Sequence, residues 1–384
     1  MMKLRIKNFK CFYDTEINLN HLTLFAGANG FGKSSAIQAL LFMRHTIEHC
    51  SKWNETRFTG ELDTNLKVDL NGTYCLSLGM SSDVIPIDAE RNSIMSVEVK
   101  DDTSSYTVQY NLNDEKNQLC LNLKQYDASG VYCLLPIFDK AFYYLNAERL
   151  GPRTSNPFKF HDYPNVGYQG EYTAQILSQY GYKNDNADEI LVDLDRRFNP
   201  DNKYLLHQVS EWMDYLMPGV TIGVKDDYDL QRAQIIVKNS FSNDKSVRST
   251  NIGFGISYVL PIIVTGLLAK KGSIMIVENP EAHLHPSAQS RIGYFLSRVA
   301  QTGVYVIIET HSEHLLNGIQ IAVAKEIINK DLVTINYFNT NDNRSLQVKE
   351  IAVSDHGHLS EWPYGFFDQT QRDYSILYRL NMND

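Results

Sequence analysis

The chain has 384 residues, the length of one large domain or of two closely packed ones. Hydrophobic residues make up 43% and charged residues 21%, an ordinary balance for a globular protein with a buried core. The formal net charge of −9 gives no support for non-specific binding to nucleic acid, which calls for a basic chain or a basic surface. The net charge does not exclude a local basic groove.

The remaining composition points to a cytoplasmic protein. The five cysteines form no CxxC pair, so we expect reduced thiols rather than a disulfide framework or a zinc ribbon. The N-terminal residues alternate polar and apolar and lack the apolar core of a signal peptide. The most apolar helical run, residues 256–269, is shorter than the roughly 20 residues needed to cross a bilayer.

The N-terminal part predicts three strands and a helix. Residues 3–6 and 16–19 read as short strands, and 22–26 form an apolar run that leads directly into Gly27. Apolar residues at helical spacing predict a helix over about 33–49.

The middle of the chain is predicted to be rich in β-strands first and mainly helical afterwards. Residues 67–131 consist of short alternating runs separated by turn residues, which predicts antiparallel strands and a β-rich insertion over 59–140. A strand follows at 141–146, and after a Gly/Pro-rich break the segment 172–217 is mainly helical. Two more strands are predicted within 220–237.

From residue 251 onward, helices and strands alternate. We predict a helix over about 256–271, strands at 273–277 and 304–308, and helices over 287–301 and from 313. This alternation is typical of a parallel sheet with helices on its faces, so the predicted fold class is α/β.

Residues 27–34, GANGFGKS, fit the phosphate-binding P-loop pattern GxxxxGK[ST] in full, which makes the predicted α/β fold that of a P-loop NTPase. Glycines let the backbone curl so that its N–H groups point at phosphate oxygens, and the following helix adds its positive end. Lys33 would neutralise β- and γ-phosphate charge, and the Ser34 hydroxyl would bind Mg²⁺. The alternative is a chance match, but the motif follows an apolar strand and opens a helix. The candidate nucleotide-binding residues are Gly27, Asn29, Gly30, Gly32, Lys33, Ser34 and Ser35.

A second motif is SIMIVENPEAHLHP, residues 273–286, in which an apolar strand ends in Glu278. We expect Glu278 to lie beside Ser34 and to hold Mg²⁺, usually through water. An ordinary strand that ends in a surface glutamate is the alternative. A further alternative takes His283 and His285 as metal ligands, although the sequence offers no further ligand cluster.

Two further motifs complete the set. The strand at 304–308 leads into Glu-Thr-His-Ser, which places His311 where an imidazole can bond the γ-phosphate or the attacking water. Gly253, Gly255 and Ser257 open a helix about 25 residues before Glu278, and such a helix start can donate N–H groups to a phosphate. A plain glycine-rich turn is the alternative for this segment.

In this order the four motifs resemble the ABC-type ATPase heads of the SMC, RecF and OLD group. They are especially similar to short AAA_15/AAA_21-like ATPases of bacterial antiphage defence, such as the Septu PtuA type. The segments LRIKNFKCFYD, YYLNAERLGPR, VGYQGEYTAQIL, ETHSEHLLNGI and LSEWPYGFFDQ also look like that group. The resemblance implies a head formed by residues 1–58 and 141–384, with a helical signature lobe at about 170–270.

The resemblance further implies a dimer that binds ATP and Mg²⁺ between residues 27–34 of one subunit and 253–257 of the other. Such a dimer would regulate an effector, for example a nuclease encoded nearby. Nuclease activity of the chain itself is not expected, because only about seventy residues follow His311, too few for the nuclease domain of the OLD relatives. Sustained heptads are missing, so a DNA-entrapping coiled coil is not expected either.

One departure concerns catalysis, because Asn279 stands where the group usually has a catalytic glutamate. An amide cannot act as a base near neutral pH, so we hypothesise that Glu281 activates water while Asn279 and His311 position it. Slow hydrolysis in an ATP-gated clamp is the alternative. Lys10 is a candidate near the adenine or α-phosphate, and Arg149 is a candidate in the Q-loop region, with a solvated surface charge as the alternative for each.

Three other functions compete with the regulatory dimer. They are a DNA-binding repair or recombination ATPase, the ATPase subunit of a transporter, and an ATP-sensing scaffold with little turnover. We expect Trp362, Phe366 and Phe367 to be packing residues of the C-terminal segment.

Overall fold

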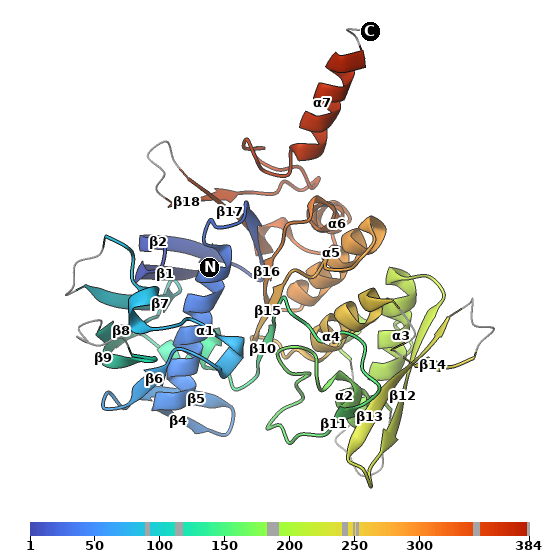
Figure 1. Ribbon diagram of the computed structural model, residues 1–384, viewed down its shortest axis with the longest axis horizontal. Helices are drawn as coiled ribbons and strands as arrows, with labels where there is room; N and C mark the ends of the chain where they lie inside the picture. The colour runs from blue at the N-terminus through green and yellow to red at the C-terminus, as the bar shows by residue number, and fades with distance from the viewer. Residues whose placement is uncertain are drawn as a thin grey trace.

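A six-stranded sheet with the strand order β10-β15-β16-β3-β17-β18 forms the centre of the protein (Figure 1). β18 pairs antiparallel with β17, and the other neighbours are parallel. The strands are β3 (Leu22–Gly27), β10 (Phe142–Leu145), β15 (Ile274–Glu278), β16 (Tyr305–Glu309), β17 (Val333–Thr340) and β18 (Leu346–Ile351). The computed structural model describes residues 1–88, 93–111, 118–182, 192–239, 245–248, 250, 253–340 and 346–381.

A second sheet is antiparallel throughout and has the order β2-β1-β7-β8-β9-β6. Its strands are β1 (Met2–Phe9), β2 (Phe12–Leu19), β6 (Lys67–Asp69), β7 (Ile94–Lys100), β8 (Ser105–Asn111) and β9 (Cys120–Ser129). The antiparallel strands predicted within 67–131 are thus confirmed. They continue the sheet that β1 and β2 begin, since Leu4 of β1 pairs with Val99 of β7. The hairpin of β4 (Ser51–Asn54) and β5 (Arg57–Leu62) crosses the domain boundary drawn at residue 58.

Helix α1 (Lys33–Cys50) lies between the two sheets. Its buried residues pack against the antiparallel sheet on one side and against Phe25, Phe142 and Ile276 of the central sheet on the other. Because α1 begins where β3 and its loop end, this packing fixes the start of the helix relative to the central sheet.

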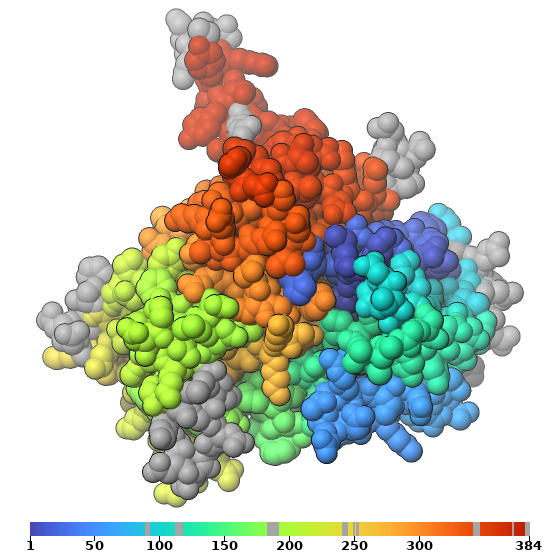
Figure 2. Space-filling model, turned by 180° about the vertical axis from the view of Figure 1, so that it is seen from behind, coloured from blue at the N-terminus to red at the C-terminus, as the bar shows by residue number. Residues whose placement is uncertain are grey.

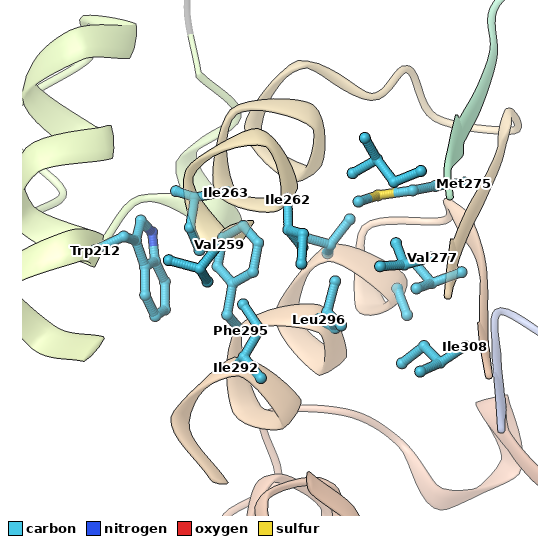
Figure 3. Close-up of a cluster of buried hydrophobic side chains, with 14 of the residues drawn as sticks. Trp212, Val259, Ile262, Ile263, Met275, Val277, Ile292, Phe295, Leu296 and Ile308 are labelled. Atoms are coloured by element: carbon cyan, nitrogen blue, oxygen red, sulfur yellow. The ribbon is translucent and has the colours of Figure 1, made fainter. Parts of the chain in front are cut away.

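The opposite face of the central sheet carries three helices, α4 (Phe254–Leu268), α5 (Pro286–Gln301) and α6 (Glu313–Ala324). Figure 3 shows the core that they form, in which Ile262 and Phe295 lie between the helices and Met275 and Ile308 come from the strands. The indole of Trp212, fully buried, extends this core into a helical lobe. The lobe consists of α2 (Thr173–Tyr180), α3 (Leu205–Leu216), β11 (Asn156–Pro157), β12 (Val220–Asp227), β13 (Arg232–Asn239) and β14 (Val247–Arg248).

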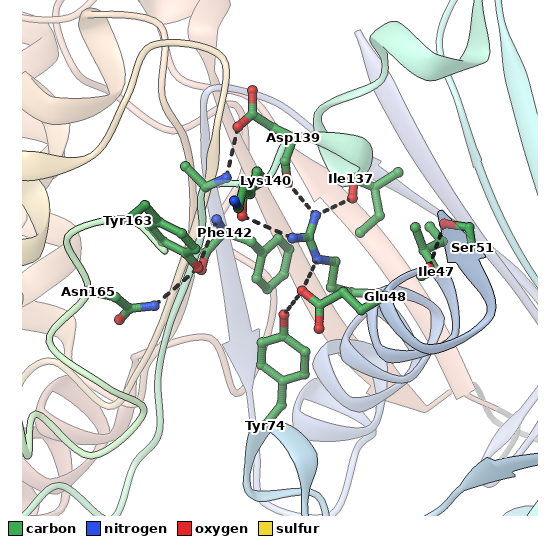
Figure 4. Close-up of polar contacts among 12 residues, drawn as sticks. Ile47, Glu48, Ser51, Tyr74, Ile137, Asp139, Lys140, Phe142, Tyr163 and Asn165 are labelled. Atoms are coloured by element: carbon green, nitrogen blue, oxygen red, sulfur yellow. Dashed lines mark hydrogen bonds and ion pairs between the residues drawn. The ribbon is translucent and has the colours of Figure 1, made fainter. Parts of the chain in front are cut away.

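A buried guanidinium ties α1 to the segment that precedes β10 (Figure 4). Arg44 is 0% exposed, and its Nη1 donates to the carbonyl oxygens of Ile137 at 2.6 Å and Asp139 at 2.5 Å. Its Nε donates to Glu48 at 2.7 Å, and the Tyr74 hydroxyl donates to the same carboxylate at 2.6 Å. These bonds satisfy a charge that would be costly to bury alone, and they hold the P-loop helix against the entry to β10.

The C-terminal segment packs on the body and then leaves it. Phe366 is 1% exposed and its ring contacts Tyr337, Trp362 and Phe367, which confirms the packing role expected for this segment. The following helix, α7 (Gln369–Asn381), projects outward from the rest of the structure (Figures 1 and 2). None of the helices in the described ranges has the length and apolar character of a membrane-spanning segment.

Candidate functional site

The loop between β3 and α1 has the backbone shape that its glycines permit. Gly27, Gly30 and Gly32 all have positive φ, at 137°, 82° and 89°. A Cβ atom on Gly27 would lie 2.3 Å from the carbonyl oxygen of Phe338, so only glycine fits there. The strand, loop and helix predicted around GANGFGKS are therefore present, and α1 starts with no acidic residue in its first turn. This helix start is suited to an anion.

Lys33 points back into its own loop. Its Nζ donates to the carbonyl oxygens of Gly27 at 2.8 Å and Ala28 at 2.9 Å, and the residue is only 3% exposed. Burial lowers the pKa of Lys33, while the nearby carboxylates of Glu309 and Glu281 act in the opposite direction. The lysine is thus held close to the loop that would receive phosphate.

Ser34 is in contact with Glu309, a residue that the sequence analysis did not select. The Ser34 hydroxyl donates to Glu309 Oε1 at 2.8 Å. We expected Glu278 beside Ser34, but β16 lies between β15 and β3, so its own terminal glutamate makes the direct contact. The role of Glu278 toward Mg²⁺ stays a prediction. Glu309 is 4% exposed, and its Oε2 has no hydrogen-bond partner in the described structure.

Glu278, at the end of β15, lies one strand further from the P-loop than Glu309, and its carboxylate is hydrogen-bonded to a side chain of β10. Its Oε1 accepts a hydrogen bond from the Tyr144 hydroxyl at 2.9 Å, and Asn146 donates to the same hydroxyl oxygen at 2.9 Å. Burial, together with the charge of Glu309, raises the pKa of Glu278 to about 7. Glu278 and Glu309 are register partners at the ends of neighbouring parallel strands. The two carboxylates therefore share one edge of the sheet.

Glu281 and His311 meet at the same edge. Glu281 Oε1 accepts a hydrogen bond from the backbone N–H of His311 at 2.7 Å, and its Oε2 is buried without a partner in the part of the chain described. Burial raises the pKa of Glu281. Partial burial, and secondarily Lys33, lower the pKa of the His311 imidazole, which favours its neutral form.

Asn279 occupies a turn that few residue types tolerate. Its φ is 45°, in the left-handed region, where asparagine is among the non-glycine residues most often found. Its backbone N–H donates to the carbonyl of Glu309 at 2.8 Å, which joins the turn to β16. The side chain makes no hydrogen bond to any residue within the described ranges.

Arg149 is buried, which excludes the alternative of a solvated surface charge, while its role in the Q-loop region stays a prediction. It is 3% exposed, and its guanidinium donates to four backbone carbonyls at 2.6 to 3.0 Å. These carbonyls belong to Asn146, Tyr258, Glu278 and Asn279. Arg149 therefore links the end of β10, the turn after β15 and helix α4 at a single point.

Lys10 bonds to α1 rather than to the P-loop. Its Nζ donates to Gln38 Oε1 at 2.7 Å, and burial lowers its pKa. Gln38 lies one turn beyond Ser34 on the same helix, and a role for Lys10 near the adenine or α-phosphate stays a prediction.

The glycine-rich start of α4 is only partly described, because Asn251 and Ile252 lie outside the described residues. Gly253 precedes the helix, and a Cβ on Gly255 would lie 2.8 Å from the carbonyl oxygen of His283. The close approach of α4 to the segment after β15 therefore requires glycine at position 255. Phe254 is 57% exposed at the tip of the helix. The role of Gly253, Gly255 and Ser257 toward a phosphate stays a prediction.

The alternative that takes His283 and His285 as metal ligands gains no support from the contacts of the two rings. The His283 ring packs against Tyr258 and Phe254, with centroids 4.5 Å and 5.8 Å apart. His285 caps α5, accepting at Nδ1 from the backbone N–H of Ser287. Within the described ranges, no group of three or more histidine, cysteine or acidic side chains is placed to hold a metal ion.

A nucleotide-bound Mg²⁺ needs fewer protein ligands than a resident metal, because it keeps waters and binds substrate phosphates. Ser34 and Glu309 supply a hydroxyl and a carboxylate beside the P-loop, and Glu309 Oε2 is buried and unpaired. Glu278 adds a second carboxylate at the same edge. These residues fit Mg²⁺ delivered with a nucleotide.

Comparison with known families gives three matches along the chain. Residues 1–146 match a model described as "AAA ATPase domain", and residues 138–317 match "AAA domain, putative AbiEii toxin, Type IV TA system". Residues 328–377 match "Protein of unknown function (DUF3696)". A search of curated proteins finds no match.

The chain is similar to solved structures of SMC heads. The SMC head bound to the C-winged helix domain of ScpA is 13% identical, covers 92% of this chain and 97% of its own, and has a TM-score of 0.50. The SMC head of Thermotoga maritima gives 11% identity, coverage of 92% and 98%, and a TM-score of 0.43. The SMC head with an extended coiled coil bound to the C-terminal domain of ScpA, derived from Pyrococcus furiosus, gives 10% identity, coverage of 99% and 100%, and a TM-score of 0.48. The first comparison confirms the predicted α/β P-loop fold.

The raised pKa of Glu278 predicts that the nucleotide-free protein loses stability as pH rises. The folded state holds a proton on Glu278 up to a pKa of about 7, whereas the unfolded chain releases it near the ordinary value of 4.5. The free energy of unfolding should therefore fall between pH 4.5 and 7, by at most about 3 kcal/mol from this residue.

Urea denaturation at several pH values, without Mg²⁺ or nucleotide, measures this effect. Glu278→Gln should flatten the pH dependence by about one proton, leaving the contributions of Glu281 and Glu309, whose pKa values burial also raises. An unchanged slope in Glu278→Gln would show that Glu278 is ionised in the folded protein throughout this range.

Proposed function

We propose that the chain, which matches two AAA ATPase domain models and shares the fold of an SMC head, hydrolyses ATP and closes into a dimer around the nucleotide. The observation that carries the proposal is the convergence at one sheet edge of Lys33, the Ser34–Glu309 pair and the Glu281–His311 pair. A phosphate-binding loop, a place for Mg²⁺ and a candidate base are thus adjacent.

In the proposed reaction, the phosphates of ATP take the place of the Gly27 and Ala28 carbonyls as partners of Lys33. Ser34, Glu309 and Glu278 would hold Mg²⁺, which would offset the negative charge of the phosphates. The P-loop N–H groups and the start of α1 bind the phosphate oxygens.

Glu281 is the proposed general base. Its Oε1 accepts from the backbone of His311, the Thr310 side chain also favours its ionised form, and its Oε2, without a partner at good hydrogen-bond geometry among the described residues, would accept a proton from water. A raised pKa makes this carboxylate a better base than an exposed glutamate. The neutral His311 imidazole and the Asn279 amide orient the water or bond the γ-phosphate. Arg149 is a positioning residue that holds the Glu278–Asn279 turn through its carbonyls.

The dimer completes the site in this proposal. Gly253, Gly255 and Ser257 of the second copy would donate to the γ-phosphate of the ATP held by the first. Closure on ATP and opening after hydrolysis would then switch a partner effector, such as a nuclease encoded nearby, in antiphage defence. This biological setting is supported by the family resemblance, and a head of the same fold has been solved with a domain of ScpA bound.

Two other functions have a weaker basis. DNA binding by a repair ATPase is opposed by the net charge of −9. An ATP-sensing scaffold with little turnover is favoured by one observation, namely that Asn279 replaces the usual carboxylate.

The role of Glu281 is tested by Glu281→Gln. We expect ATP turnover to fall by about 10²–10⁴, because the variant keeps the hydrogen-bonding oxygen but loses the base. ATP binding should persist, and dimers should accumulate with ATP in mass measurements. Glu313→Gln, at the nearby start of α6, is the matched control and should turn over ATP normally. Normal hydrolysis by Glu281→Gln would refute the assignment.

The role of the Asn279 side chain is tested by comparing Asn279→Gly with Asn279→Ala. Alanine in the left-handed conformation should lower the free energy of unfolding by about 1–2 kcal/mol, whereas glycine adopts it readily and should lose less. If the amide orients water, the stable glycine variant should still lose turnover by at least about tenfold. Turnover at the wild-type rate in Asn279→Gly would show that asparagine serves the backbone alone.

A further inference from the structure

Helix α7 exposes a large apolar surface that the rest of the chain does not cover. Its apolar side chains are more than half exposed: Tyr374 68%, Ile376 56%, Leu377 54%, Tyr378 64% and Leu380 59%. Figure 2 shows α7 standing off the body of the molecule. Tyr374, Leu377 and Tyr378 follow the i, i+3, i+4 spacing of one helical side, whereas Arg379 lies on the opposite side. A 13-residue helix of this kind is marginal in water on its own, so α7 needs a partner surface.

The base of α7 lies at the candidate ATP site. Gly365, Asp368 and Arg372 line the same hollow as Gly27 and His311. The segment before α7 is anchored on β17, since the Tyr337 hydroxyl donates to the carbonyl oxygen of Tyr364 at 3.0 Å and the Tyr337 ring packs on Phe366 with centroids 5.2 Å apart. α7 therefore starts from a fixed point at the edge of the P-loop.

From these observations we propose that α7 is a dimerisation arm whose apolar side packs against a second copy of this chain. The inference rests on the proposed function, in which the second copy closes over the P-loop. We place α7 along the second copy because it begins at the rim of the P-loop and projects outward from its own body. In that arrangement the start of the second copy's α4, with its exposed Phe254, would lie over the P-loop and thus near the base of α7. A two-fold dimer forms this contact twice, once from each copy.

The size of the apolar surface on α7 decides whether the arm could hold a dimer together by itself. Covering the exposed apolar side chains would bury on the order of 500 Å² of α7, below the roughly 800 Å² per partner of a standard interface. The arm alone is therefore too small to hold a stable dimer. It adds to an interface that ATP bridges, so its loss should weaken the ATP-dependent dimer without touching nucleotide binding.

The test is the mass of the full chain, over a range of concentrations, with Mg²⁺ and a non-hydrolysable ATP analogue. Leu377→Glu should raise the concentration of half-association at least about tenfold, while binding of the analogue and the thermal midpoint stay unchanged. Tyr374→Glu, on the same side of α7, should act alike. Arg379→Glu is the control, because it changes the net charge by more than Leu377→Glu but lies on the opposite side of α7. The Arg379→Glu protein should associate like the wild type.

Two outcomes would overturn the proposal, and they separate it from the proposed function. If the wild type and Leu377→Glu form the same dimers, the ATP-bridged dimer stands but the arm does not, and α7 is then assigned to a different protein. If the wild type binds the analogue and stays monomeric at all concentrations, the dimer and the arm both fail.

Discussion

The candidate site depends on the register of three parallel strands, β15, β16 and β3. Glu278 pairs with Glu309, and Glu309 pairs with Phe25, so the carboxyl ends of the strands lie level at one edge of the sheet. Hydrogen-bond ladders fix this register, and a slip by one residue would turn each carboxylate to the other face. Ligands of open α/β sheets bind at this edge, and the P-loop follows directly from β3.

Burial of charge is the second constraint. Glu281 and Glu309 lie near the buried Lys33, Glu278 lies near Glu309, and burial raises the pKa of all three carboxylates. Such an arrangement costs stability in the absence of nucleotide, but a bound cation and a transferred phosphate offset that cost. Arg149 shows how the fold maintains it, since its buried guanidinium donates to backbone carbonyls and fixes the turn after β15, while its charge favours the ionised forms of Glu278 and Glu281. Together these features hold the buried carboxylates in fixed positions before a nucleotide binds.

The features that sequence could predict were those with a local signal. The P-loop, the strands that flank it and the helix after it follow from glycine spacing and hydrophobic period, and the structure contains them. Glu309 was missed because its contact with Ser34 depends on strand order, which no local pattern records. Arg149 looks like a surface charge in sequence, since only tertiary packing buries it. The left-handed turn at Asn279 and the exposed apolar side of α7 also needed the folded chain.

The most direct test of this account is the binding of ATP with Mg²⁺ by the purified protein, compared with Lys33→Ala. Calorimetric titration should show one nucleotide per chain for the wild type, and a loss of at least about 2 kcal/mol of binding free energy in the variant, because Lys33 is the cation of the phosphate loop. Failure of the wild type to bind ATP, or equal binding by Lys33→Ala, would contradict the assignment of residues 27–34 as the nucleotide site.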